Sequence, residues 1–214
     1  QISKQNQIPY ASMYRRGVWE RLGGYRRRMK SAEDAEFWTR AMSYGYVAKK
    51  VTEAPTLIYR NRAASMSHVE KEPDWKAWMT WVKMPSLLPY AGGGPVWSYG
   101  PLLLSVVIPV GPKHVSYLQD SLDSLIAQTF KEWEVIVVND TGKSLTLPGY
   151  PFARIIDTPG NRGPAYARNR GFEAAQTELV VLLDADDYFQ PMALESLYKA
   201  SQTRDGWFYP DWFA

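Results

Sequence analysis

The chain has 214 residues, of which 45% are hydrophobic, so it can bury a substantial core as one large domain or two small ones. It contains no cysteine, which excludes disulfides and thiolate metal sites and leaves carboxylate, imidazole and water as metal ligands. The net charge of +3 is unevenly divided: residues 1–102 carry 16 Lys and Arg against 8 Asp and Glu, and residues 103–214 carry 9 against 14.

The first 70 residues have an irregular pattern. Gly23 and Gly24 interrupt the chain before a predicted helix over residues 32–44, and residues 47–59 have the composition of a strand. Glu33 and Asp34 fall at the start of the predicted helix. Acids are common there because they interact favourably with the helix dipole, and a catalytic role is the alternative interpretation.

Residues 71–102 are predicted to form a linker. Trp75, Trp78 and Trp81 are spaced by three and fit one face of a short helix, and the glycine run 92–94 fits a flexible connector. Packing of a helix explains the tryptophans more simply than the alternative, an aromatic platform that binds sugars.

Residues 103–214 alternate between strand and helix patterns. Strands are predicted at 104–110, 135–138, 153–157 and 179–183, and helices at 117–130, 164–175 and 191–200. The apolar runs 104–110 and 135–138 suit strands that are buried on both faces. This alternation predicts an α/β fold with a mostly parallel central sheet that helices cover on both faces. Ligands of such sheets bind at the carboxyl ends of the strands, where Asp140 and Asp184 follow two of them.

Two motifs in this second part indicate chemistry. The last predicted strand ends on Asp184, Asp186 and Asp187, whose mutual repulsion a divalent cation such as Mg²⁺ or Mn²⁺ would relieve. A solvated acidic turn is the alternative. Gly163 opens a predicted helix and Arg168 follows about one turn later, a pattern that suits an anion such as a diphosphate.

The sequence resembles the family 2 glycosyltransferases of the GT-A fold, which is Rossmann-like and binds nucleotide sugars. Their donor-binding half is matched in order by five segments: 105–110, 128–130, 134–140, 163–169 and 183–187. Their acceptor-binding half is matched by 23–25, 33–34, 37–38, 45–46 and 59–67.

The order of the two halves is reversed relative to that family. We therefore predict an acceptor-binding half at 1–70, the linker at 71–102 and a donor-binding half at 103–214. The chain could be a circular permutant with one composite site, a homodimer that exchanges half-domains, or a fragment of a tandem enzyme.

The resemblance implies a role for each matching residue. Pro109 and Val110 would line the nucleoside pocket, Asp140 would bind the base, Asp184 would approach the ribose and Arg168 would lie near the diphosphate. Mn²⁺ or Mg²⁺ would be held by Asp186 and Asp187, with His68 as a further ligand. Asp34, with Glu33 beside it, would deprotonate the acceptor hydroxyl for a single displacement with inversion.

The implied function is the transfer of a sugar from a nucleotide-sugar donor, expected to be a UDP-sugar, to a carbohydrate, lipid-linked or protein acceptor. A nucleotidyltransferase is an alternative, although residues 110–114 are too short for its triphosphate loop. An inactive fragment or binding module is another.

The only tight basic cluster is at 26–28, so we expect no nucleic-acid partner. With no apolar run of about 20 residues and no signal peptide expected, the sequence predicts a cytoplasmic protein, with peripheral membrane contact as an option.

Overall fold

The computed structural model describes residues 11–27, 29, 32–58, 104–202 and 207–213, of which 52–55 and 211–213 are described by backbone alone. In chain order the first segment forms β1 (Met13–Arg15), α1 (Arg16–Leu22), α2 (Glu33–Ser43) and β2 (Ala48–Ile58). The second segment forms β3 (Leu104–Val110), a 3₁₀ turn (Val115–Tyr117), α5 (Leu118–Ile126), β4 (Trp133–Asn139), β5 (Ala153–Asp157), α6 (Pro164–Ala174), β6 (Leu179–Leu182), β7 (Tyr188–Phe189), α7 (Ala193–Ser201) and β8 (Trp207–Phe213).

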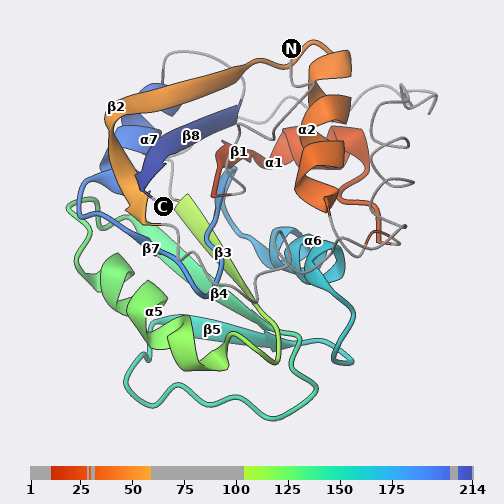
Figure 1. Ribbon diagram of the computed structural model, residues 1–214, viewed down its shortest axis with the longest axis vertical. Helices are drawn as coiled ribbons and strands as arrows, with labels where there is room; N and C mark the ends of the chain where they lie inside the picture. Colours follow the sequence, from red (N-terminus) through yellow and green to blue (C-terminus); the bar gives the residue numbers. More distant parts are fainter. Residues whose placement is uncertain (1–10, 28, 30–31, 59–103, 203–206, 214) are drawn as a thin grey trace.

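The described strands form one sheet in the order β5-β4-β3-β6-β1-β8-β2-β7 (Figure 1). The run β5-β4-β3-β6 is parallel throughout, and β8 is parallel to β2. β1 is antiparallel to both of its neighbours, and β7 is antiparallel to β2. Strands of the first segment therefore lie between and beside strands of the second, and the two segments share one sheet.

Helices cover both faces of the sheet, as the sequence predicts. Alternate residues of each strand point to opposite faces, so β3 gives Val106 and Ile108 to one core and Val107 to the other. α5 and α7 pack on the first face, and α1, α2 and α6 on the second, which Figure 1 shows as helices on either side of the strands. The predicted α/β fold with a mostly parallel sheet is confirmed.

Most predicted elements form within a few residues of their expected ends. The strands at 104–110 and 153–157 have the predicted bounds, and α2 begins at Glu33. The predicted helix 117–130 was too long, since α5 ends at Ile126. Beyond it the chain turns, so that Phe130 stacks on Tyr198 of α7 with ring centroids 4.8 Å apart. The predicted linker and its three tryptophans lie outside the described residues.

The sequence analysis missed the short elements β1, α1, β7 and β8. β1 has three residues and β7 two, too few to show a period. β1 is defined by its partners, because Met13 and Tyr14 pair with Val181 and Val180 of β6 on one side and with β8 on the other. Only the assembled sheet makes this stretch a strand.

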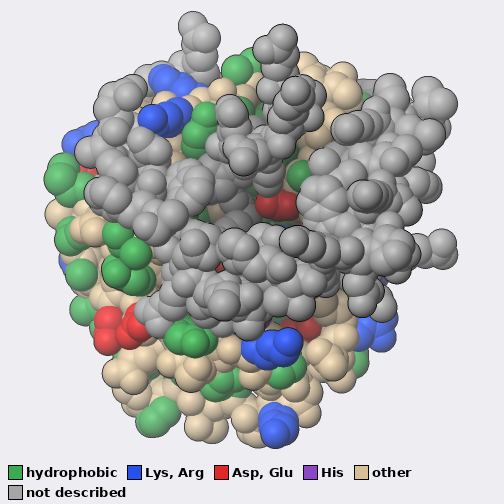
Figure 2. All heavy atoms as spheres, in the orientation of Figure 1, with side chains coloured by type: hydrophobic (Ala, Val, Ile, Leu, Met, Phe, Trp, Pro, Cys, Tyr) green, Lys and Arg blue, Asp and Glu red, His purple; other side chains and the backbone are tan. Residues whose placement is uncertain are grey.

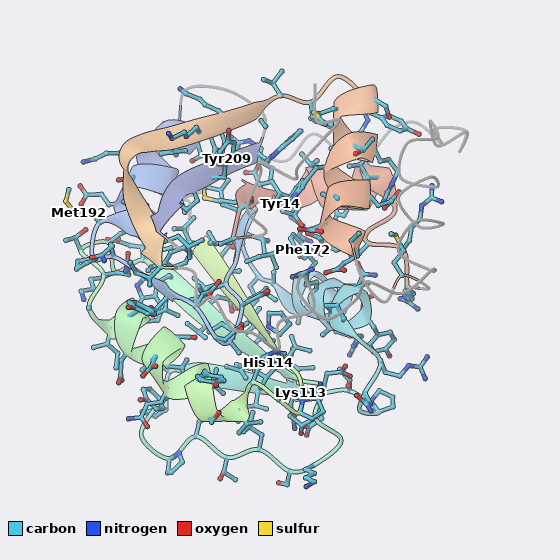
Figure 3. The ribbon with its side chains drawn as sticks, in the orientation of Figure 1. Tyr14, Lys113, His114, Phe172, Met192 and Tyr209 are labelled. Carbon is cyan, nitrogen blue, oxygen red and sulfur yellow. The ribbon has the colours of Figure 1, made fainter. Side chains whose placement is uncertain are left out.

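Aromatic rings fill the contact between the two segments. Tyr14 of β1 stacks on Phe172 of α6 with centroids 4.9 Å apart, and Figure 3 shows the two side chains next to each other. Trp19 stacks on Phe172 as well, at 5.4 Å. Trp38 of α2 packs edge-on against Tyr14 at 5.3 Å and stacks on Trp207 of β8 at 5.5 Å. These rings are largely buried, so the contact resembles the core of a single domain.

Charged groups also join the two segments. Arg15 pairs with Glu178 at 2.7 Å, and Arg27 pairs with Glu173 at 3.2 Å. In both pairs the basic first segment gives the arginine and the acidic second segment the glutamate, in line with the uneven charge of the sequence. Figure 2 shows acidic side-chain atoms of described residues both near the centre of one face and at its lower left edge, and basic side chains mostly toward the margin. Among the described helices, none combines the length and apolar character that a membrane span requires.

Candidate functional site

The candidate site lies where the parallel strand order reverses. From β3 the chain moves to β4 and then β5 on one side, whereas β6 returns to the other side of β3. The carboxyl ends of β3, β4 and β6 therefore meet at one edge, which is where open α/β sheets bind ligands. This edge carries Val110, the last residue of β3, Asp140, the residue after β4, and Asp184, two residues after β6.

Pro109 and Val110 end β3 in different environments. The Val110 side chain is fully buried in the core that α5 covers, and its carbonyl accepts a hydrogen bond from the amide of Asp140 at 2.9 Å. Pro109, on the opposite face of the strand, keeps part of its surface exposed. The predicted lining of a nucleoside pocket therefore falls to Pro109 and to the backbone after it, since the Val110 side chain points into the core.

Asp140 organises the loop that leads into α6. Its carboxylate accepts hydrogen bonds from the Thr158 hydroxyl, from the amide of Arg162 at 3.1 Å and from the amide of Gly163 at 2.8 Å. Asp140 is 4% exposed, so its carboxylate is bonded mainly to these protein groups and has little contact with solvent. Asp140 therefore fixes the loop at the start of α6. Its predicted hydrogen bond to a base stays a prediction.

The start of α6 is built from residues with unusual backbone angles. Asn161 and Gly163 have φ of 55° and 89°, and Pro164 opens the helix. Proline at this position costs no hydrogen bond, because the first amides of a helix have no partner within it. The result is a fixed helix start beside the end of β4, as an anion-binding site at a helix N-terminus requires.

Arg168 lies in the second turn of α6 and is 3% exposed. Its Nη1 binds the carboxylate of Glu33, and its Nη2 lies 3.1 Å and 3.3 Å from the two carboxylate oxygens of Asp184. The guanidinium also lies over the ring of Tyr25, 5.8 Å from its centroid. Glu33 and Asp184 are separated by about 150 positions in the chain, and one buried arginine joins them.

The acids that begin α2 face this arginine. Ala32, just before the helix, has φ of 56°, and Glu33 is 4% exposed. Asp34 accepts a hydrogen bond from the amide of Ala35 at 2.7 Å. Burial first, and then the charge of Glu33, raise the pKa of Asp34 to about 6, although Arg168 counteracts them. A carboxyl with a raised pKa of this size is suited to accept a proton at neutral pH.

The three acids after β6 have unequal access to solvent. The side chain of Asp184 is 25% exposed, and Asp186 is also partly exposed. Burial raises the pKa of Asp184, Arg168 lowers it and the charge of Asp186 raises it again. Asp187 is 1% exposed, and Ser121 of α5 donates hydrogen bonds to the carbonyls of Ala185 and Asp187, at 2.9 Å and 2.7 Å.

The described residues contain no ready-made cluster of three or more His, Cys, Asp or Glu ligands. Mg²⁺ and Mn²⁺ are commonly held by one or two carboxylates together with substrate phosphates, so such a cluster is not required. The partly exposed carboxylates of Asp184 and Asp186 supply oxygen donors of the right kind, and they fit such an ion. Asp187 has much less access, and His68 lies outside the described residues.

Sequence reasoning overlooked two residues near this edge. His114 follows β3 in the loop that it shares with Lys113 (Figure 3), and it slightly offsets the rise in the pKa of Asp184 that burial causes. Asn169 binds both the amide and the carbonyl of Tyr25, each at 2.8 Å. The sequence signal for Asn169 is the matching segment 163–169, which also contains Arg168.

Comparison with known proteins assigns the second segment. The family model described as Glycosyl transferase family 2 matches residues 105–211. The uncharacterized glycosyltransferase YwdF of Bacillus subtilis (strain 168) is 35% identical over 48% of this chain and 39% of its own length. The succinoglycan biosynthesis protein ExoW of Rhizobium meliloti (strain 1021) is 33% identical over 47% of this chain and 34% of its own length.

Solved structures match a similar share of this chain at similar sequence identity. A crystal structure of S. aureus TarS in complex with UDP-GlcNAc is 30% identical, covers 47% of this chain and 30% of that chain, and has a TM-score of 0.41. This chain spans less than half the length of the curated relatives named above. Residues 11–58 fall outside the family match, which includes β3, the edge residues Asp140 and Asp184, and Arg168. On the match over 105–211, the chain belongs to glycosyl transferase family 2.

Proposed function

We propose that this chain transfers a sugar from a nucleoside-diphosphate sugar to an acceptor hydroxyl, at one site built from both segments. The observation that carries the proposal is the buried contact of Arg168 with Glu33 and Asp184. It brings the start of α2, which bears Asp34, to the edge of the sheet where a donor would bind. UDP-sugars are the first donors to test, because the family resemblance favours uridine.

Donor binding would use the carboxyl ends of the strands. Pro109 and the backbone that follows it would contact the nucleoside, and the loop that Asp140 holds would present the start of α6 to the diphosphate. Asp184 would approach the ribose, and Asp186 would hold a divalent cation with Asp187 beside it. When bound, the cation would supply positive charge to the departing diphosphate. Because Arg168 is buried between Glu33 and Asp184, it would hold the Asp184 carboxylate in place next to the bound donor.

Acceptor activation is assigned to Asp34. Its carboxylate would accept the proton of the acceptor hydroxyl while the hydroxyl oxygen attacks the anomeric carbon, and the bond from that carbon to the diphosphate oxygen breaks. A single displacement of this kind inverts the anomeric configuration. Glu33 would remain bound to Arg168 and would keep Asp34 in a negative environment, which makes its carboxylate a stronger base.

The rate of transfer should follow the ionisation of Asp34. The base is active when it is deprotonated and its pKa is about 6, so kcat/KM should fall as the pH drops through 6 and level off above about 7. The measurement is a pH profile of nucleoside-diphosphate release in the presence of acceptor. An acidic limb below pH 5, in the usual range of an exposed carboxyl, would contradict this assignment.

The reversed order of the halves leaves two alternatives to a permuted single chain. Two chains could exchange half-domains, or the chain could be part of a tandem enzyme whose halves pair with neighbouring domains. The shared sheet and the buried aromatic contact within one chain support the composite site. Sedimentation of the chain tests the exchange, because a monomer that binds a nucleotide needs no partner copy.

The metal assignment is tested at Asp186. We expect Asp186→Ala to weaken binding of UDP by at least about tenfold and to remove its dependence on Mn²⁺, because one ion–carboxylate contact is lost. Calorimetry with and without Mn²⁺ measures both effects, and thermal-shift screening of other nucleoside diphosphates covers the choice of base.

The matched control is Asp123→Ala, which removes the same charge from the exposed face of α5. It should leave the Kd of UDP and its metal dependence unchanged. If Asp186→Ala binds UDP like the parent chain with the same response to Mn²⁺, the metal assignment is wrong. A transferase should bind UDP and also hydrolyse or transfer the sugar of a UDP-sugar, whereas a binding module should only bind. A chain that does not use nucleoside triphosphates as substrates is not a nucleotidyltransferase.

A further inference from the structure

We propose that Arg168 is a positioning residue that locks the base-bearing start of α2 onto the donor-binding edge of the sheet, and that it is not a ligand of the diphosphate. The inference rests on the proposed function for its catalytic meaning. The contact of Arg168 with both Glu33 and Asp184 is seen in the structure and does not depend on that function.

The contacts of Arg168 leave it poorly placed to bind a phosphate. The residue is 3% exposed, and its two terminal nitrogens are used by two different carboxylates. The ring of Tyr25 covers the guanidinium at 5.8 Å. A diphosphate would have to displace Glu33 or Asp184. Displacing Glu33, which is 4% exposed, would leave a buried carboxylate without its counter-charge, which is costly.

The two carboxylates that Arg168 joins each stand next to a proposed functional residue. Glu33 directly precedes Asp34, and Asp184 lies two positions before Asp186. A guanidinium is planar and rigid, so its two nitrogens fix the separation between the carboxylates that they bind. Small displacements of a base from its substrate strongly reduce the rate, so this separation matters to transfer.

The next residue of α6 strengthens the same connection. The side-chain amide of Asn169 binds the backbone of Tyr25 at both its amide and its carbonyl, and its oxygen also accepts from Trp19 at 3.0 Å. Two consecutive side chains of α6 thus hold the first segment. Asn169 anchors the Gly23–Tyr25 turn, and Arg168 anchors the start of α2.

The test compares Arg168→Met and Arg168→Lys with Arg40→Met. Arg40 is a matched control because it is 5% exposed, also pairs with a glutamate, Glu36 at 2.7 Å, and also lies over an aromatic ring, that of Phe37. Its carboxylate partner lies on its own helix, so its loss removes a buried arginine without separating Glu33 from Asp184.

We expect both Arg168 variants to lose at least about 100-fold in kcat, while Arg40→Met keeps kcat within about threefold at a temperature where circular dichroism shows all chains folded. Lysine should not restore kcat, because one ammonium cannot replace two separate nitrogens. The ratio of the affinities for UDP and uridine should stay within about threefold of the parent value in all variants. A selective loss of UDP affinity in the Arg168 variants would mean that Arg168 binds the diphosphate, and a retained kcat would mean that it positions nothing.

A second measurement does not depend on activity. In unfolding experiments, Glu33→Gln and Arg168→Met should be coupled by about tenfold in the unfolding equilibrium constant, and so should Asp184→Asn and Arg168→Met. Additive effects in either cycle would overturn the inference. If the parent chain binds no nucleotide and transfers no sugar, the proposed function fails, yet these cycles still decide whether Arg168 joins the two segments.

Discussion

Asp34→Asn is expected to reduce sugar transfer by about 100- to 10,000-fold, the usual contribution of a general base. Asparagine has nearly the same shape and can still accept the hydrogen bond from the amide of Ala35, but it cannot take a proton at neutral pH. Binding of UDP should remain within about threefold of the parent, because the base contacts the acceptor and not the donor. Steady-state transfer and calorimetry on the same preparations measure the two quantities.

The Asp34→Asn chain should remain folded. The pKa of Asp34 is raised from 3.8 to about 6 in the folded protein, so its ionisation opposes folding increasingly as the pH rises through that interval and fully above it. A neutral side chain removes this cost, and the variant should be at least as stable as the parent at pH 7. Transfer that persists within about threefold, or that is lost together with UDP binding, would remove Asp34 from the role of base.

Gly171→Ala is expected to destabilise the fold by about 2 to 3 kcal/mol, although alanine is the better helix former by about 1 kcal/mol. Gly171 lies in α6 where the helix rests on β3. A Cβ atom added there would overlap Cγ1 of Val107 and lie 3.0 Å from its Cγ2. Valine is branched and stiff, so the helix must move away from the sheet. Chemical denaturation with both chains measures the difference.

The matched control for this prediction is Gly17→Ala in α1. Gly17 is also helical, but it is exposed and a Cβ there would meet no atom within 4 Å. The same substitution should therefore stabilise the fold by about 0.5 to 1 kcal/mol, through the lower entropy of the unfolded chain. Opposite signs at the two glycines identify packing as the cause. Stabilisation at Gly171 would mean that α6 does not lie this close to β3.

Local patterns were sufficient for the elements of the second segment. β3 and β5 have the bounds that the sequence predicts. β3 is a continuous apolar run that is almost wholly buried, whereas β5 lies at the end of the sheet and has no buried residue. The positions of Asp140 and Asp184 at the edge follow from the same patterns, since parallel strands that alternate with helices place their carboxyl ends together. The start of α2 at Glu33 also followed from the sequence.

Partners distant in the chain could not be inferred in the same way. β1 is a strand only because β6 and β8 flank it, and three residues carry no period of their own. Arg168 was expected near a diphosphate on the basis of its position in a helix. The structure places it between Glu33 and Asp184, a contact that only the assembled fold decides, and its nearness to a diphosphate stays a prediction.

The sequence by itself determined the alternation of strands and helices, the acids at the strand ends and the family resemblance, since each of these depends on neighbours within a few residues. The tertiary structure decided that both segments share one sheet, that Asp140 holds the loop before α6, and that burial beside Glu33 brings the pKa of Asp34 to about 6. These features depend on desolvation and on contacts between charges far apart in the chain, and such contacts exist only after the chain has folded.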